Sequence, residues 1–151
     1  MKIVYNNANK ATGISAVSLM TELGKFTGFA KCAPSDMKHF SKISGCMYAE
    51  NRAYIKYAKA KIKWLKSKQK AIITFTDSIR RSKALTRDDI LRKLYRTINV
   101  YEKEIANWND KIKNKENEII EDIKKIDDYY LNKDKKSNEL EKDRPSKTTD
   151  S

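Results

Sequence analysis

Residues 55–79 read IKYAKAKIKWLKSKQKAIITFTDSI, and this stretch decides the fold that the sequence predicts. Apolar side chains recur in it at alternating steps of three and four residues, from Ile55 to Ile79. This seven-residue repeat keeps an apolar stripe on one side of a helix that winds around a partner. Neither Gly nor Pro occurs between residues 46 and 144. We therefore expect one long helix from about Met47 to about Arg81.

A second stripe follows after a short interruption. Residues 82–86 read SKALT and predict a turn, and Thr86 with Asp89 favours the start of a new helix. From Leu91 to Tyr129, ten of the twelve positions in the same repeat are apolar or aromatic. Two matching stripes joined by a short turn predict an antiparallel two-helix coiled-coil hairpin over residues 47–131.

The flanking segments differ from the hairpin in composition. Residues 1–46 hold all four glycines and Pro34. Met1–Tyr5 is compatible with a short strand or an arm, and short helices are expected at 15–23 and 34–43. We therefore predict a small N-terminal cap of short helices. Residues 132–151 lose the apolar pattern, which predicts a disordered tail. The predicted fold class is all-α.

The net charge of the chain is formally +13, and its distribution is uneven. Residues 48–84 hold 11 basic and 2 acidic residues, whereas residues 85–133 hold 11 of each. The excess of positive charge therefore falls on the first predicted hairpin helix and, to a lesser extent, on residues 1–47. A basic surface of this kind points to an acidic partner, above all nucleic acid.

Three lysines of the first hairpin helix are the best candidates for contacts with phosphates. They lie seven residues apart, one step from the apolar stripe, and two aromatic residues adjoin them. The predicted nucleic-acid-binding residues are Lys56, Tyr57, Lys63, Trp64 and Lys70. The lysines would neutralise phosphates, and the aromatic rings would stack on an exposed base. The competing interpretation is that Tyr57 and Trp64 form the floor on which residues 1–46 pack.

Other chemistries find little support. Cys32, His39 and Cys46 are spaced by seven residues, whereas structural zinc sites use four ligands at closer spacings. We therefore predict no metal site, and no motif indicates a cofactor. His39 is the only histidine, and no nucleophile–His–acid set or phosphate-binding glycine loop can be assembled. The sequence therefore predicts a non-catalytic protein.

The leading functional prediction is a small basic helical protein that binds nucleic acid or a nucleoprotein through its first hairpin helix. The alternative is a protein–protein interaction module that acts as an adaptor or as an inhibitor of a larger machine, such as those encoded by phages or mobile elements. It would dock through the exposed end of the hairpin, including Ile119–Tyr130. A homodimer or an oligomeric scaffold is a third interpretation. We expect a cytoplasmic location without membrane contact, because no apolar run is long enough to cross a bilayer.

Overall fold

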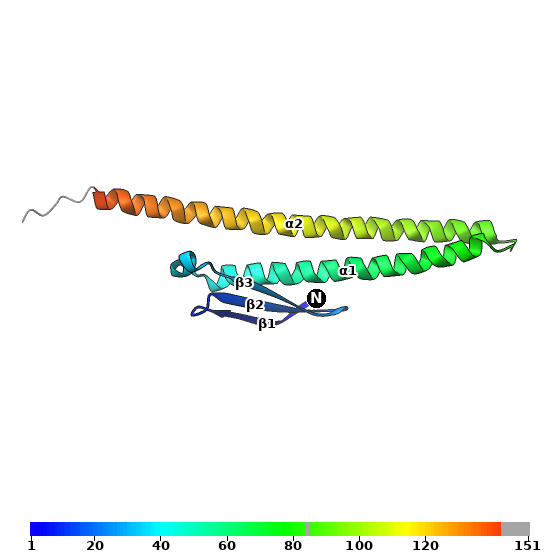
Figure 1. The fold of residues 1–151 in the computed structure, drawn as a ribbon, viewed down its shortest axis with the longest axis horizontal. Coiled ribbons are helices and arrows are strands. Elements are labelled where there is room, and N and C mark those ends of the chain that lie inside the picture. Colours follow the sequence, from blue (N-terminus) through cyan, green and yellow to red (C-terminus); the bar gives the residue numbers. More distant parts are fainter. Residues whose placement is uncertain (84, 143–151) are drawn as a thin grey trace, which may run out of the picture. The chain divides into compact units, whose positions relative to one another are not determined.

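A computed structural model describes residues 1–83 and 85–142, apart from the side chains of Ser35, Asp36 and His39. The chain divides into two units, Met1–Glu116 and Asn117–Ser151. The first unit holds a three-stranded sheet, a short 3-10 helix, the long helix α1 and the beginning of the long helix α2 (Figure 1). The second unit, in its described part, is the remainder of α2.

The N-terminal region is a β-sheet and not a cap of short helices. Strands β1 (Lys2–Asn9), β2 (Ile14–Thr21) and β3 (Gly24–Lys31) form an antiparallel meander in the order β1-β2-β3. The prediction of an all-α fold is therefore wrong, and the fold is α+β. Of the two alternatives for Met1–Tyr5, a short strand or an arm, the structure has a strand, which extends to Asn9 with an irregularity in the pairing between Ile3 and Tyr5.

Strand β2 explains why a helix was expected here. Ser15, Val17 and Leu19 are almost fully buried on the face that meets α1, and Ser18, on the opposite face, is buried as well. On the other face, Ile14 and Met20 are apolar but exposed. Apolar residues on both faces hide the two-residue period of a strand. A short apolar run of this kind cannot be distinguished from a helical segment by its pattern alone.

Helix α1 (Lys42–Arg80) covers the inner face of the sheet at close range. A Cβ added to Gly28 would lie 1.9 Å from the backbone oxygen of Ala49, and one added to Gly45 would lie 2.1 Å from Ser15 Oγ. Only residues with very small side chains permit this approach. Ala53, another small residue of α1, lies at the same contact and is fully buried. The core of the first unit forms here, and its buried members are Val17, Leu19, Ala30, Ala49 and Ala53.

The close approach also explains why α1 contains a glycine near its beginning. We expected Ser44 and Gly45 to end a short helix, but the observed 3-10 helix is Pro34–His39 and α1 already starts at Lys42. The Ser41 hydroxyl accepts a hydrogen bond from the Ser44 backbone N–H at 3.3 Å and caps the helix. Gly45 therefore lies inside α1, where the contact with Ser15 requires it.

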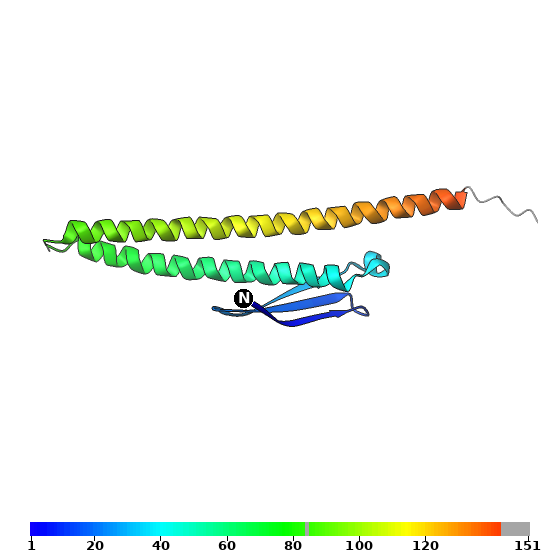
Figure 2. The same ribbon diagram turned by 180° about the vertical axis from the view of Figure 1, so that it is seen from behind.

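The predicted helical hairpin is confirmed. Helix α1 ends at Arg80 and α2 (Arg87–Lys142) begins after a short connection, at the predicted position. Within residues 1–116, α1 lies between the sheet and the first part of α2 (Figure 2). The Trp108 ring of α2 packs on Tyr54 and Tyr57 of α1, with centroid distances of 6.3 and 5.5 Å. Near the turn, the Arg80 guanidinium donates a hydrogen bond to the Tyr95 hydroxyl.

The predicted boundary of the C-terminal tail is wrong. Helix α2 continues through residues 132–142 to Lys142, beyond the expected end at 131. Only polar residues and Leu140 occupy this extension, so the apolar repeat gave no signal for it. The segment keeps good helix formers such as Lys, Glu and Leu and contains no Gly or Pro. Residues 143–151, the rest of the predicted tail, lie outside the described residues.

Candidate nucleic-acid interface

Six basic side chains form one row along α1, at alternating steps of four and three residues. We call this row the basic stripe: Arg52, Lys56, Lys59, Lys63, Lys66 and Lys70. Alternating steps of this size keep residues on one face of a helix, and the row spans about 27 Å along the axis. All six residues are exposed, and no Asp or Glu occurs from residue 51 to residue 76. The stripe is therefore a continuous positive surface.

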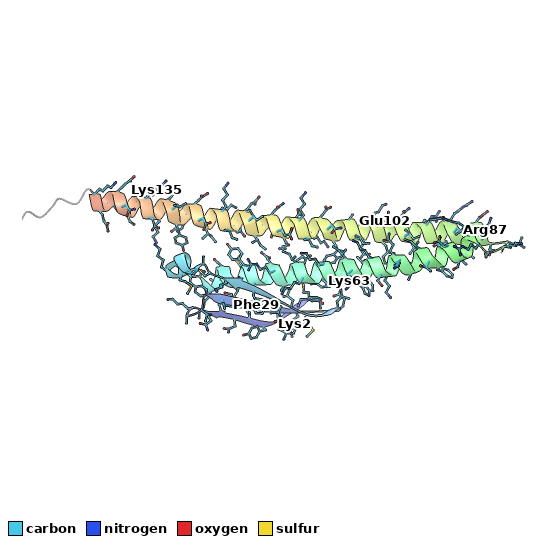
Figure 3. All side chains as sticks on the ribbon, in the orientation of Figure 1. Lys2, Phe29, Lys63, Arg87, Glu102 and Lys135 are labelled. Atoms are coloured by element: carbon cyan, nitrogen blue, oxygen red, sulfur yellow. The ribbon has the colours of Figure 1, made fainter. Side chains whose placement is uncertain are left out.

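The stripe is exposed because the other two sides of α1 are already used. Ala49, Ala53 and Tyr57 are buried on the side that meets the sheet. A second group of buried side chains forms the seam of the hairpin, and it consists of Ile55, Ala58, Ile62 and Leu65. Packing thus positions the basic side chains on the third side of the helix. Figure 3 labels Lys63 on α1 and Phe29 on the neighbouring sheet.

The N-terminal end of the stripe is tied to the edge of the sheet. Arg52 Nη1 donates a hydrogen bond to the Phe29 carbonyl oxygen at 2.7 Å, and Lys56 Nζ donates one to the Thr27 carbonyl oxygen at 2.6 Å. The Lys56 ammonium also lies 5.7 Å from the centroid of the Phe29 ring. These bonds satisfy acceptors at an edge that would otherwise be open to another strand. Arg52 and Lys56 therefore have a structural role in addition to their charge.

The remaining four lysines of the stripe have no such role. Among the residues that the structure describes, no hydrogen bond or ion pair engages the ammonium groups of Lys59, Lys63, Lys66 or Lys70. Their charges are not neutralised locally, so they remain available to an external anion. Long lysine side chains on a helix surface can move to meet phosphates without a change in the backbone.

Tyr57 belongs to the core and cannot stack on a base. It is 7% exposed, and its ring packs on Phe26 and Trp108, with centroid distances of 5.8 and 5.5 Å. Its hydroxyl donates a hydrogen bond to Glu22 Oε1 at 2.6 Å. Burial, followed by this hydrogen bond, raises the pKa of Tyr57 to about 12. The structure therefore places Tyr57 in the floor under residues 1–46 and not in a binding surface.

Trp64 lies apart from the row of predicted lysines. Consecutive residues of a helix are about 100° apart, so Trp64 points well away from Lys63. The nearest cations to its ring centroid are Lys61 Nζ at 4.8 Å and Lys68 Nζ at 5.5 Å. The ring is 41% exposed. A contact of Trp64 with a ligand therefore stays a prediction, but the structure does not bring this ring together with Lys56, Lys63 and Lys70.

Glu22 is the one acidic residue of residues 1–31, and its carboxylate is engaged. Tyr57 OH and Lys61 Nζ donate to its Oε1 at 2.6 and 3.0 Å. The hydrogen bond from Tyr57, a backbone hydrogen bond and the bond from Lys61 together lower the pKa of Glu22 to about 2. The negative charge of the sheet is therefore held at the β2–β3 turn against α1, and it does not oppose the stripe.

Sequence reasoning found Lys56, Lys63 and Lys70 but missed the other half of the stripe. Arg52, Lys59 and Lys66 were not among the residues predicted to bind nucleic acid. The alternating four- and three-residue spacing would have identified all six residues. The sheet contacts of Arg52 and Lys56 had no such signal, because strand β3 was not expected.

The described residues give no indication of a metal centre. The side chains of Cys32 and Cys46 are of intermediate exposure. In the described part of the chain, no group of three or more His, Cys, Asp and Glu residues could hold a metal ion. The side chain of His39, which was weighed with the two cysteines as a ligand, lies outside the described residues.

Comparison of the chain with protein-family models, curated proteins and solved structures finds no match. Its function is therefore inferred from its own residues. Among residues 1–83 and 85–142, no helix has the length and apolar character that a membrane crossing requires.

Proposed function

We propose that this chain is a non-catalytic protein that binds nucleic acid, alone or within a nucleoprotein, through the basic stripe of α1. The observation that carries the proposal is the row of six exposed basic residues over 52–70 with no acidic residue from 51 to 76. Phosphates of a nucleic-acid backbone recur at short, regular intervals. A linear row of cations on a rigid helix can neutralise several of them together.

The composition of the stripe favours affinity over sequence recognition. Lysine ammonium groups are point charges, and contacts with phosphates carry no direct sequence information. The stripe contains only one Arg, and no Asn or Gln joins it to read base edges. We therefore expect similar affinity for nucleic acids of unrelated sequence, and strong weakening by salt.

A titration of the full chain tests this proposal. Fluorescence anisotropy would follow binding to a labelled single strand and to a labelled duplex, from low to moderate salt. If the four unengaged lysines each contact a phosphate, log K should fall with log salt with a slope of about −3 to −4. No binding at low salt, or a slope near zero, would overturn the proposal.

A second candidate function is supported by a separate observation. The described part of the second unit exposes a set of apolar side chains along α2, and these are Ile120, Ile123, Tyr129, Leu131 and Leu140. Exposed apolar residues on one helix favour a protein partner or a second copy of the chain. Sedimentation of the chain with and without an Ile120→Gln, Ile123→Gln change distinguishes the two. A dimer that dissociates in the variant indicates self-association, and a monomer in both leaves a different protein as the partner.

A further inference from the structure

The outer face of the sheet is the surface opposite to α1, and its composition is unusual for a solvated face. The strand pairing places Tyr5, Ser18 and Thr27 side by side across the three strands, with Phe29 next to Ala16. Side chains alternate between the two faces of a strand. These residues therefore lie on the face opposite to the one that holds Val17 and Leu19. The residues of the outer face that are exposed and apolar or aromatic are Tyr5, Ile14, Met20 and Phe29.

Two exposed aromatic rings stand out on this face. Tyr5 is 47% exposed and Phe29 is 55% exposed. They lie on the two edge strands and one pairing step apart, so their Cα atoms are separated by about 12 Å. Within residues 1–116, helix α1 covers the inner face and leaves both rings accessible to solvent. Exposed apolar and aromatic residues that gather on one face, rimmed by polar residues, are typical of a binding surface.

The charged residues within the three strands are all positive. Lys2, Lys25 and Lys31 are exposed and lie on the outer face. Lys2 and Lys25 pair with Met20, and Lys31 pairs with Ile14, which are both residues of that face. Strands β1, β2 and β3 contain no Asp or Glu. In addition, the Lys56 ammonium lies 5.7 Å from the centroid of the Phe29 ring, which joins this face to the basic stripe. A ligand of the outer face must therefore combine flat apolar groups with negative charge.

We propose that the outer face binds single-stranded nucleic acid, with bases stacked on Tyr5 and Phe29 and phosphates held by the surrounding lysines. Single-stranded nucleic acid fits both requirements, since its bases are flat and unpaired and its backbone is anionic. A duplex fits less well, because its bases remain stacked on one another and offer the rings no face. The inference rests on the proposed function and adds a second surface and a strand preference to it.

A local contact restrains one of the two rings. Asn7 Nδ2 donates a hydrogen bond to the Tyr5 hydroxyl at 3.3 Å, which restrains the Tyr5 side chain on the strand. Between the rings, the Ser18 and Thr27 hydroxyls lie 2.7 Å apart and bind each other. This polar centre is already covered, since Ser18 is 2% exposed, so bases would contact the exposed rings on either side of it. The spacing of the rings allows two bases of one strand to stack separately.

The test compares wild type with the Tyr5→Leu, Phe29→Leu variant in binding to a labelled single-stranded oligonucleotide and to a labelled duplex. Leucine keeps the apolar character and removes the flat ring. We expect single-strand affinity to fall at least about fivefold for each ring lost, while duplex affinity changes little. Tyr129→Leu, an exposed ring in the second unit, is the matched control and should alter neither affinity.

The possible outcomes separate this inference from the proposed function. If lysine changes in the stripe weaken binding but the Tyr5→Leu, Phe29→Leu variant binds single strands like wild type, the inference is overturned and the proposed function stands. If wild type binds neither oligonucleotide, both fall. A dimer that dissociates in the variant would assign the face to a second copy of the chain and also overturn the inference.

A second measurement does not depend on the variant being folded. Wild type would be irradiated with a single-stranded oligonucleotide that carries photoreactive thymidine analogues, and the cross-linked peptide would be identified by mass spectrometry. Cross-links at Tyr5 or Phe29 are expected. Efficient cross-links confined to the α1 peptide, with none in residues 1–31, would contradict the inference.

Discussion

Lys56 Nζ lies 2.6 Å from the backbone carbonyl oxygen of Thr27, and this hydrogen bond joins the basic stripe of α1 to the outer edge of β3. Lys63 is one repeat further along the same helix face and has no comparable bond among the described residues. Two lysines that are equivalent in the seven-residue repeat therefore differ in what they do. Lys56 supports the fold, whereas Lys63 carries an unneutralised charge.

This difference predicts distinct effects of the same substitution. Lys56→Met should lower the free energy of unfolding by up to about 1 kcal/mol, because a sheet-edge hydrogen bond is lost. Lys63→Met should leave stability nearly unchanged and reduce the salt dependence of nucleic-acid binding by about one phosphate contact. Urea unfolding and anisotropy titrations of the two variants measure these effects. Equal stability of the two variants would contradict the structural role of Lys56.

The Glu22 carboxylate predicts a dependence of stability on pH. Its pKa is about 2 in the folded chain against an ordinary value of 4.5, so the unfolded chain takes up this proton more readily as the pH falls. The stabilisation by the bonds from Tyr57 and Lys61 is therefore fully present above about pH 4.5 and is lost as the pH falls towards about 2. Glu22→Gln should lower the urea midpoint near neutral pH, and the difference from wild type should shrink over this range.

The control for this experiment is Glu50→Gln. Glu50 is an exposed residue of α1, and its substitution removes the same charge without touching the Tyr57 hydroxyl. A Glu22→Gln effect that is as large at about pH 2 as near neutral pH would show that the carboxylate charge is not what stabilises this contact.

The contact between Ser15 and Gly45 predicts coupling between two substitutions. A methyl group at Gly45 would meet Ser15 Oγ at 2.1 Å, so Gly45→Ala should destabilise by about 1–3 kcal/mol, although Ala is the better helix former. Ser15 Oγ is buried and has no hydrogen-bond partner among the described residues, so Ser15→Ala should cost little or stabilise.

A double-mutant cycle checks this prediction. In the Ser15→Ala background, Gly45→Ala should cost less, with a coupling of about 1 kcal/mol or more. Thermal or urea unfolding of the four chains provides the free energies. Strictly additive costs would mean that the helix and the strand do not press on each other at this point.

The hairpin could be predicted from the sequence because its signal is long and periodic. The apolar seam of α1 recurs over Ile55, Ile62 and Leu65, and no Gly or Pro interrupts it. The sheet could not be predicted for a physical reason. Its inner face uses small residues such as Ser15, Gly28 and Ala30, whereas its outer face carries Tyr5, Met20 and Phe29. The usual alternation of apolar inside and polar outside is absent, so the two-residue period did not show.

The candidate site was predicted in part for the same reason. The charge of α1 is visible in sequence, and Lys63 and Lys70 remain exposed in the structure. The role of Tyr57 depends on Phe26 and Glu22, which the fold brings to it from the sheet. A side chain whose partners lie more than thirty residues away in the chain cannot be assigned to core or surface from local spacing alone.

The central claim is that the unengaged lysines of the stripe bind phosphates, and one comparison tests it most directly. The triple variant Lys59→Gln, Lys63→Gln, Lys66→Gln is set against Lys133→Gln, Lys135→Gln, Lys136→Gln, which removes the same charge from exposed positions of the second unit. The measurement is the slope of log K against log salt for a single-stranded oligonucleotide. The stripe variant should reduce the slope by about two, and the control should leave it unchanged. Equal slopes in the two variants would show that net charge, and not the stripe on α1, determines binding.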